Sequence, residues 1–118
     1  MLKIPDKRYT FDVRRERSSL QHLIAEDLDV GAFDKRAHFE DWVENVVGRR
    51  RATPEFDREL NNLLEIDYSI HYHVWTDRDI REIVDYTRTT LHLHWRPVVL
   101  WEAHFYRKEC VVVLERMH

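Results

Sequence analysis

The chain has 118 residues, of which 43% are hydrophobic, enough for one domain with its own apolar core. Its 19 lysines and arginines stand against 22 aspartates and glutamates, and the net charge of −3 gives no general attraction for nucleic acid or an anionic membrane. Only two glycines occur, Gly31 and Gly48, so neither a P-loop nor a GxGxxG turn can be written.

The first two predicted helices are marked by their ends. A cap at Ser18 or Ser19 and a stop at Gly31 bound the first helix, whose apolar residues follow a three-and-four spacing. The second ends at Gly48, a residue suited to the left-handed position after a helix. Its apolar face is the clearest in the chain and consists of Phe39, Trp42, Val43, Val46 and Val47.

The third predicted helix begins at Thr53 and Pro54, a side-chain cap followed by proline at the first helical position. This helix is predicted to end near Asp67. The helical spacing of apolar residues does not continue into residues 68–75. Aromatic and β-branched residues are frequent there, which predicts a short extended strand segment.

The last third of the chain predicts a helix followed by a hairpin. Thr76 and Asp79 have the spacing of a capping box, and the helix they start has a buried side made of Ile80, Ile83, Val84 and Leu91. Residues 95–105 carry an apolar side chain at every odd position, which predicts a strand with one strongly buried face. The near-continuous valines of residues 109–115 fit a strand covered on both sides.

This order of elements predicts an α/β chain that is α+β in isolation, with an N-terminal helical layer packed on a small sheet. One domain is expected over residues 1–118, mainly helical over 1–67 and β-α-β-β over 68–118. The single cysteine, Cys110, allows no intrachain disulfide, and no apolar run approaches the roughly 20 residues that span a bilayer. We therefore expect a cytoplasmic protein that binds neither nucleic acid nor membrane.

Three segments and the terminal hairpin carry a resemblance to a known family. The segments are IPDKRYTFD at residues 4–12, HFEDW at 38–42 and DYSIHYHVWT at 67–76. Together they resemble S-adenosylmethionine-dependent methyltransferases with a Rossmann-like fold, of the group often encoded among bacterial glycan-biosynthesis genes. In that family a stretch like residues 5–9 follows the fifth strand of the sheet, and the hairpin would be strands six and seven.

The resemblance covers only the back half of that fold, because the glycine-rich loop and the ribose-binding acidic residue have no counterpart in the chain. It implies a partial methyltransferase-like protein that binds no cofactor alone and takes S-adenosylmethionine only when a cofactor-binding half complements it. Whether it is an enzyme stays open, and the chain alone is expected to be inactive. The implied acceptor is a glycan or a small molecule.

The expected acceptor site lies at what would be the carboxyl end of a strand, the edge at which open α/β sheets bind ligands. The residues predicted to bind the acceptor are Asp6, Lys7, Arg8, Tyr9, Asp12, His38 and Trp75. The alternative is a salt-bridged loop in which Asp6 and Arg8 only satisfy neighbouring backbone groups.

His71 and His73 are predicted as catalytic bases, because residues two apart on a strand share a face and neutral imidazole accepts protons near pH 7. Structural histidines are the alternative. His92 and His94 repeat the spacing, but no further ligands are seen to converge, so no metal site is assigned and a histidine-based metal-dependent enzyme is a minor alternative.

A non-enzymatic interaction module is the main alternative function. A sheet without its first strands exposes an edge and an apolar face, which favours pairing with another chain. The expected partners are a second copy of the chain or a complementing methyltransferase half.

Overall fold

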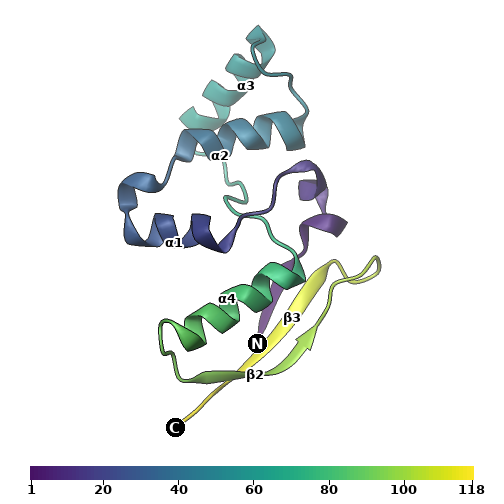
Figure 1. The fold of residues 1–118 in the computed structure, drawn as a ribbon. Helices are drawn as coiled ribbons and strands as arrows, with labels where there is room; N and C mark the ends of the chain where they lie inside the picture. Colours follow the sequence, from purple (N-terminus) through teal and green to yellow (C-terminus); the bar gives the residue numbers. More distant parts are fainter.

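The computed structural model describes the backbone of residues 1–118 and every side chain except that of Val30. Its architecture is α+β, with helices and one antiparallel three-stranded sheet in the order β1-β3-β2 (Figure 1). The elements are β1 (Leu2–Pro5), η1 (Lys7–Tyr9), η2 (Phe11–Arg14), α1 (Leu20–Leu28), η3 (Val30–Ala32), α2 (Lys35–Trp42), η4 (Val43–Val47), α3 (Pro54–Glu65), α4 (Asp77–Thr89), β2 (Trp95–Trp101) and β3 (Glu109–Arg116).

Most helix ends are set by capping residues that the sequence indicates, but α1 ends at Leu28 with Asp29 as its C-cap, before the predicted stop at Gly31. The hydroxyls of Ser19 and Thr53 each accept a backbone N–H in the first turn of α1 and α3. At the start of α4 the Asp79 carboxylate accepts the backbone N–H of Thr76 at 2.8 Å, which completes the predicted capping box. Gly48 has φ 82° and ends the second helix, as predicted.

The second helix differs from its prediction in one respect. After Trp42 it continues as the π-turn η4, in which i→i+5 hydrogen bonds turn the following residues round the helix axis. Val43 is therefore buried and Val46 partly buried, whereas Val47 is exposed. The predicted apolar face extends only as far as Val46.

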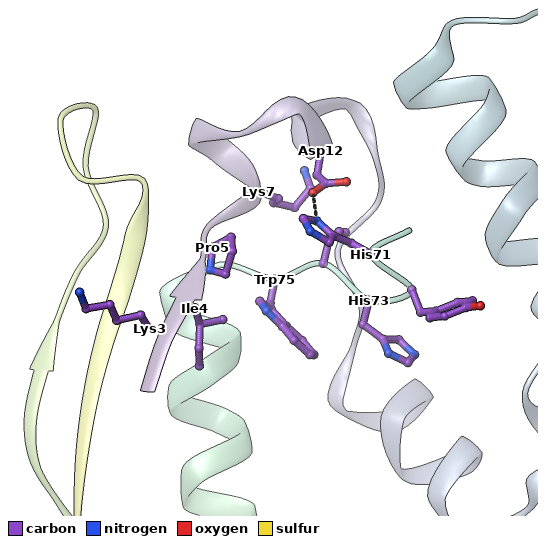
Figure 2. A pocket seen from close by; sticks show the side chains of 10 residues that line it. Lys3, Ile4, Pro5, Lys7, Asp12, His71, His73 and Trp75 are labelled. Carbon is purple, nitrogen blue, oxygen red and sulfur yellow. Dashed lines mark hydrogen bonds and ion pairs between the residues drawn. The ribbon is translucent and has the colours of Figure 1, made fainter. Parts of the chain in front are cut away.

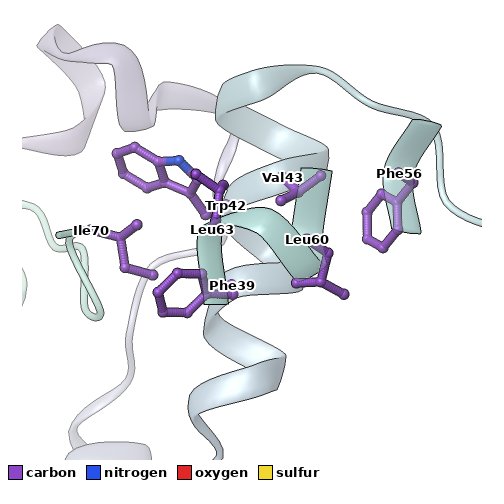
Figure 3. Close-up of a cluster of buried hydrophobic side chains, with 7 residues drawn as sticks. All are labelled: Phe39, Trp42, Val43, Phe56, Leu60, Leu63 and Ile70. Atoms are coloured by element: carbon purple, nitrogen blue, oxygen red, sulfur yellow. The ribbon is translucent and has the colours of Figure 1, made fainter. Parts of the chain in front are cut away.

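The apolar residues form two separate cores. The first joins α2, η4 and α3, which we call the helical lobe, and consists of Phe39, Trp42, Val43, Phe56, Leu60, Leu63 and Ile70 (Figure 3). The second joins α4 to the sheet, which we call the sheet lobe, and consists of Ile80, Val84, Ala103, Cys110 and Val112. The radius of gyration of 16.5 Å exceeds the value of about 13.5 Å expected for a compact chain of this length. The prediction that the N-terminal helices pack on the sheet is wrong, because the helix whose apolar residues join the core of the sheet is α4.

The hairpin is present, but its first strand lacks the predicted alternation. The register between β2 and β3 shifts between Pro97 and Val99, a position where proline has no N–H to donate. Trp101 at the end of β2 and Phe105 in the connection to β3 are exposed, which contradicts the single buried face predicted for residues 95–105. In β3, the central strand, Cys110 and the two valines after it are buried as predicted. Leu91, placed on the buried side of the fourth helix, is exposed because α4 ends at Thr89.

Residues 68–75 do not form the predicted strand. Their backbone groups bond to loops instead of to a ladder: Ser18 N–H donates to Val74 O at 2.7 Å, and Lys7 N–H to Trp75 O at 2.9 Å. The third strand comes from the N-terminus, since β1 pairs with β3 from Leu2 opposite Val112 onward. The segment 70–75 thus runs between the two lobes and carries its histidines in irregular backbone.

Candidate functional site

A cavity of about 300 Å³ lies at the junction of the two lobes, and we call it the junction cavity. It is bounded by β1, by the η1 and η2 turns and by the segment 71–75 (Figure 2). Among its lining residues are five that the sequence predicted for the site: Lys7, Asp12, His71, His73 and Trp75. The structure therefore brings the N-terminal motif and the histidine motif together, although 59 residues separate Asp12 from His71.

The central feature of the cavity is a carboxylate–imidazole pair. Asp12 Oδ2 and His71 Nδ1 are 2.8 Å apart. The Asp12 side chain is 2% exposed, whereas His71 is 47% exposed at the cavity. The His71 ring stacks on Phe11, with ring centroids 5.3 Å apart. Packing and the carboxylate together fix the direction in which the imidazole points.

Arg15 holds the buried carboxylate in place. Its Nη1 donates to Asp12 Oδ1 at 3.0 Å and to the carbonyl oxygen of His71 at 2.6 Å, and its Nε donates to Asp41 at 2.6 Å. The guanidinium thus connects η2, α2 and the histidine segment, which come from three distant parts of the chain. Because charge-assisted hydrogen bonds are strong in low dielectric, this network sets the geometry of the pair.

The contact with Asp12 determines which nitrogen of the neutral His71 ring carries the lone pair. A carboxylate only accepts hydrogen bonds, so Nδ1 carries the proton that is shared with Asp12. In neutral imidazole Nε2 is then the nitrogen that can accept a hydrogen bond, for example from a hydroxyl. A histidine oriented in this way by a third group is the arrangement of a general base.

Two other predicted residues shape the walls of the cavity. Trp75 lines it with its indole and stacks on His73, with ring centroids 6.1 Å apart. Lys7 also lines it, and its ammonium group donates to the carbonyl oxygen of Val13 at 2.9 Å. An aromatic wall opposite polar groups suits a ligand with one apolar face and several hydroxyls.

Asp6, Arg8 and Tyr9 do not line the cavity. Asp6 is buried and caps η1, with Arg8 Nε at 3.0 Å and Arg8 Nη2 at 2.7 Å, and it also accepts the backbone N–H of Asp77. Tyr9 packs against the core of the sheet lobe. These contacts match the alternative of a salt-bridged loop in which Asp6 and Arg8 satisfy neighbouring backbone groups, and in addition they connect the end of β1 to the start of α4.

The Asp6 contacts give a pH prediction. Burial raises the pKa of Asp6, but the hydrogen bonds from Arg8 and Asp77 outweigh it, so the pKa lies below its ordinary value. A lowered pKa in the folded chain means that the stabilisation is complete above pH about 4 and is lost as the pH falls further. Asp6→Asn should cost about 1–2 kcal/mol at pH 7 and flatten that acid decline.

Urea unfolding at pH 7, 5 and 3 measures this effect. Asp85→Asn is the control, because Asp85 is an exposed residue on α4. An acid decline equally steep in Asp6→Asn and in the unsubstituted chain would show that Asp6 makes no such contribution.

His38 lies apart from the junction cavity, in a second group of side chains. Glu26 Oε1 is 2.9 Å from His22 Nε2 and 3.1 Å from His38 Nε2, and Glu26 Oε2 is 2.7 Å from His73 Nε2. We call these four residues the histidine cluster. Sequence reasoning missed His22 and Glu26, although their i,i+4 spacing places both on one face of the first predicted helix.

Burial and partners act in opposite directions on the pKa values in the histidine cluster. Burial raises the pKa of Glu26, but hydrogen bonds with His38 and His73 outweigh it and bring the pKa below its usual value. Burial, together with the neighbouring His38 and His22, lowers the pKa of His73 below its ordinary value, although Glu26 acts in the opposite direction. A carboxylate facing a neutral imidazole is the resulting state near pH 7.

Comparisons with known proteins return nothing for this chain: no family model, curated protein or solved structure matches it. The methyltransferase resemblance therefore stays a prediction. Among the described residues, no helix has the length and apolar character needed to cross a membrane.

Proposed function

We propose that this chain is the acceptor-binding part of a methyltransferase-like protein, with a hydroxyl-bearing acceptor in the junction cavity and His71 as the group that takes its proton. The observation that carries the proposal is the hydrogen bond between the buried Asp12 carboxylate and His71 Nδ1 at the cavity.

The sheet supports the methyltransferase part of the proposal. The resemblance assigns residues before Pro5 to a fifth strand and the hairpin to strands six and seven. In the structure β1 ends at Pro5 and forms one sheet with β2 and β3, and α4 leads into β2. The segments that the resemblance treats as neighbours are neighbours in space.

The chemistry follows from the direction of the imidazole. A hydroxyl that donates to His71 Nε2 gains nucleophilic character as its proton moves to that nitrogen. Asp12 stays a carboxylate and stabilises the imidazolium that forms, because its hydrogen bond to Nδ1 strengthens when the ring is charged. General bases of this kind contribute roughly 10²–10⁴ in rate.

The residues present do not fit S-adenosylmethionine. Gly31 follows α1 and Gly48 caps η4, so neither lies in a turn between a strand and a helix. The three strands are antiparallel and form no parallel pair among the described residues. We propose that a complementing chain or segment holds the methyl donor and that this chain alone transfers no methyl group.

Binding of sugars tests the acceptor site. We expect neutral hexoses or N-acetylhexosamines at millimolar concentration to shift the indole N–H signal of Trp75 in ¹H–¹⁵N spectra. Trp75→Ala should weaken binding about tenfold, because the sugar loses its stacking surface. Trp101→Ala is the matched control, since Trp101 is an exposed tryptophan on β2, outside the residues that line the junction cavity.

Two outcomes would contradict the proposal. One is that the sugars leave the Trp75 signal unchanged at saturating concentration. The other is that they bind with equal affinity to Trp75→Ala and to the unsubstituted chain. Saturable binding of S-adenosylmethionine to the isolated chain would contradict the statement that its donor is held elsewhere.

The interaction module is the second candidate function. β2 is an outer strand with exposed Val98 and Trp101, and the connection to β3 exposes Phe105 and Tyr106. Exposed apolar side chains on an unpaired strand edge favour association with a second copy of the chain. A concentration-dependent dimer in sedimentation velocity, abolished by Trp101→Lys, would favour this function, and a monomer at all micromolar concentrations would exclude it.

A further inference from the structure

We infer that His22, Glu26, His38 and His73 bind one divalent transition-metal ion of the zinc type and that this ion fastens α1 to the rest of the fold. One ligand atom from each of the four residues lies within 4.8 Å of the other three. This inference does not depend on the acceptor proposal, although His73 also lines the junction cavity.

The arrangement of the ligand atoms is close to that of a bound ion. Tetrahedral ligands at about 2.0–2.1 Å from zinc lie about 3.4 Å from one another. The three imidazoles already direct the same nitrogen, Nε2, at the Glu26 carboxylate, at 2.9, 3.1 and 2.7 Å. Ring centroids of neighbouring histidines are 5.1–5.7 Å apart, so small side-chain rotations suffice to close the shell.

The chemical types of the ligands suit zinc. Imidazole nitrogen with one carboxylate oxygen is a common donor set for zinc and for other borderline metals, whereas magnesium and calcium prefer oxygen alone. The four protein ligands leave no vacant tetrahedral position, which is typical of a structural ion. We therefore assign this ion a structural role.

The surroundings of the cluster hold the rings in position. Phe33 stacks on His38 with ring centroids 5.2 Å apart, and Trp75 stacks on His73 at 6.1 Å. Tyr72 meets the edge of His38 at 5.6 Å. An apolar shell of this kind limits water around a site and strengthens the bonds inside it. His22 is 43% exposed and leaves a path for the ion from solvent.

The charges of the cluster also fit a cation. The Glu26 side chain is only 10% exposed, and every ion pair that the described residues make with it involves a histidine. A carboxylate so deeply placed is costly unless a positive charge lies beside it. A divalent ion bound to the same four residues would supply that positive charge directly.

The position of α1 explains what the ion would do. α1 has no fully buried residue, and Leu28 at its end is exposed. The cluster takes two ligands from α1, one from α2 and one from the segment before α4. An ion bound there would cross-link three elements that apolar packing joins only weakly, and metal-binding energy then adds to folding stability.

The test is a titration of the chelator-treated full chain with Zn²⁺, followed by competition with a chelator indicator. We expect one ion per chain, a dissociation constant below about 1 µM, and a rise in Tm of about 10 °C at 100-fold excess over that constant. Co²⁺ in place of Zn²⁺ should give the strong visible absorption of a tetrahedral ion. His22→Gln and His38→Gln should each weaken binding at least about 100-fold.

The variants are chosen so that misfolding does not imitate loss of a ligand. His22→Gln changes an exposed side chain, and circular dichroism checks that each variant folds without metal. His104→Gln is the matched control, because His104 is exposed at the connection between β2 and β3. No stoichiometric binding at 50 µM Zn²⁺, or equal affinity in His22→Gln and His104→Gln, would overturn the inference.

Discussion

Arg15→Ala is expected to destabilise the chain by about 3–5 kcal/mol, the cost of leaving a buried charge without its partner. The side chains of Arg15 and Asp12 are 1% and 2% exposed, so water does not replace the lost hydrogen bonds. The substitution also frees the carbonyl oxygens of His71 and Tyr72, which the guanidinium holds. Since domains are stable by only about 5–15 kcal/mol, this substitution would remove a large part of the free energy of folding.

Urea unfolding followed by circular dichroism measures this effect. Arg14→Ala is the control, because Arg14 is exposed one position earlier in η2 and should change stability by less than about 0.5 kcal/mol. Equal midpoints for the two variants would show that the Arg15 network does not hold the site. Arg15→Lys should also be destabilised, because an ammonium group cannot bond to Asp12, Asp41 and His71 at once.

Phe39→Ala is expected to cost about 3–5 kcal/mol as well, for a different reason. Phe39 is 0% exposed in the core of the helical lobe, and its removal leaves a cavity between α2 and α3 (Figure 3). Its ring also meets the edge of Tyr72 at 6.2 Å, next to His71 and His73. We expect the loss of packing to loosen both histidines, so that ligand binding at the junction cavity weakens with stability.

The control for this core substitution is Phe105→Ala. Phe105 is exposed at the connection between β2 and β3, and its removal should change the free energy of unfolding by less than about 0.5 kcal/mol. A Phe39→Ala chain as stable as Phe105→Ala would mean that the helical lobe does not depend on this core.

The helices were predictable from the sequence because their signals are local. Ser19, Thr53 and Thr76 cap three helices, and Gly48 ends the second, each through contacts within one turn. The strands were harder to predict, since their pairing depends on distant residues. Residues 68–75 have strand composition, yet loops take their backbone hydrogen bonds, while the four residues of β1 pair with β3 more than 100 positions away.

The candidate site was predictable in its residues but not in their grouping. Asp12 and His71 were both named from motifs, but their contact requires the η2 turn and Arg15, which no local pattern reveals. The sequence predicts His38 as an acceptor-binding residue and His73 as a catalytic base, whereas in the structure both contact Glu26. The i,i+4 pair His22 and Glu26 was a usable signal, because it places two metal-ligand side chains on one helix face.

The role of His71 as proton acceptor is tested by the position of the proton on its ring, read from long-range ¹H–¹⁵N correlation spectra at pH 7.5. We expect the proton of the neutral ring to lie on Nδ1, with the lone pair on Nε2, a preference that Asp12→Asn weakens and that Asp85→Asn leaves unchanged. A ring with its proton on Nε2, or one that is the same in Asp12→Asn, would contradict His71 as the proton acceptor of the junction cavity.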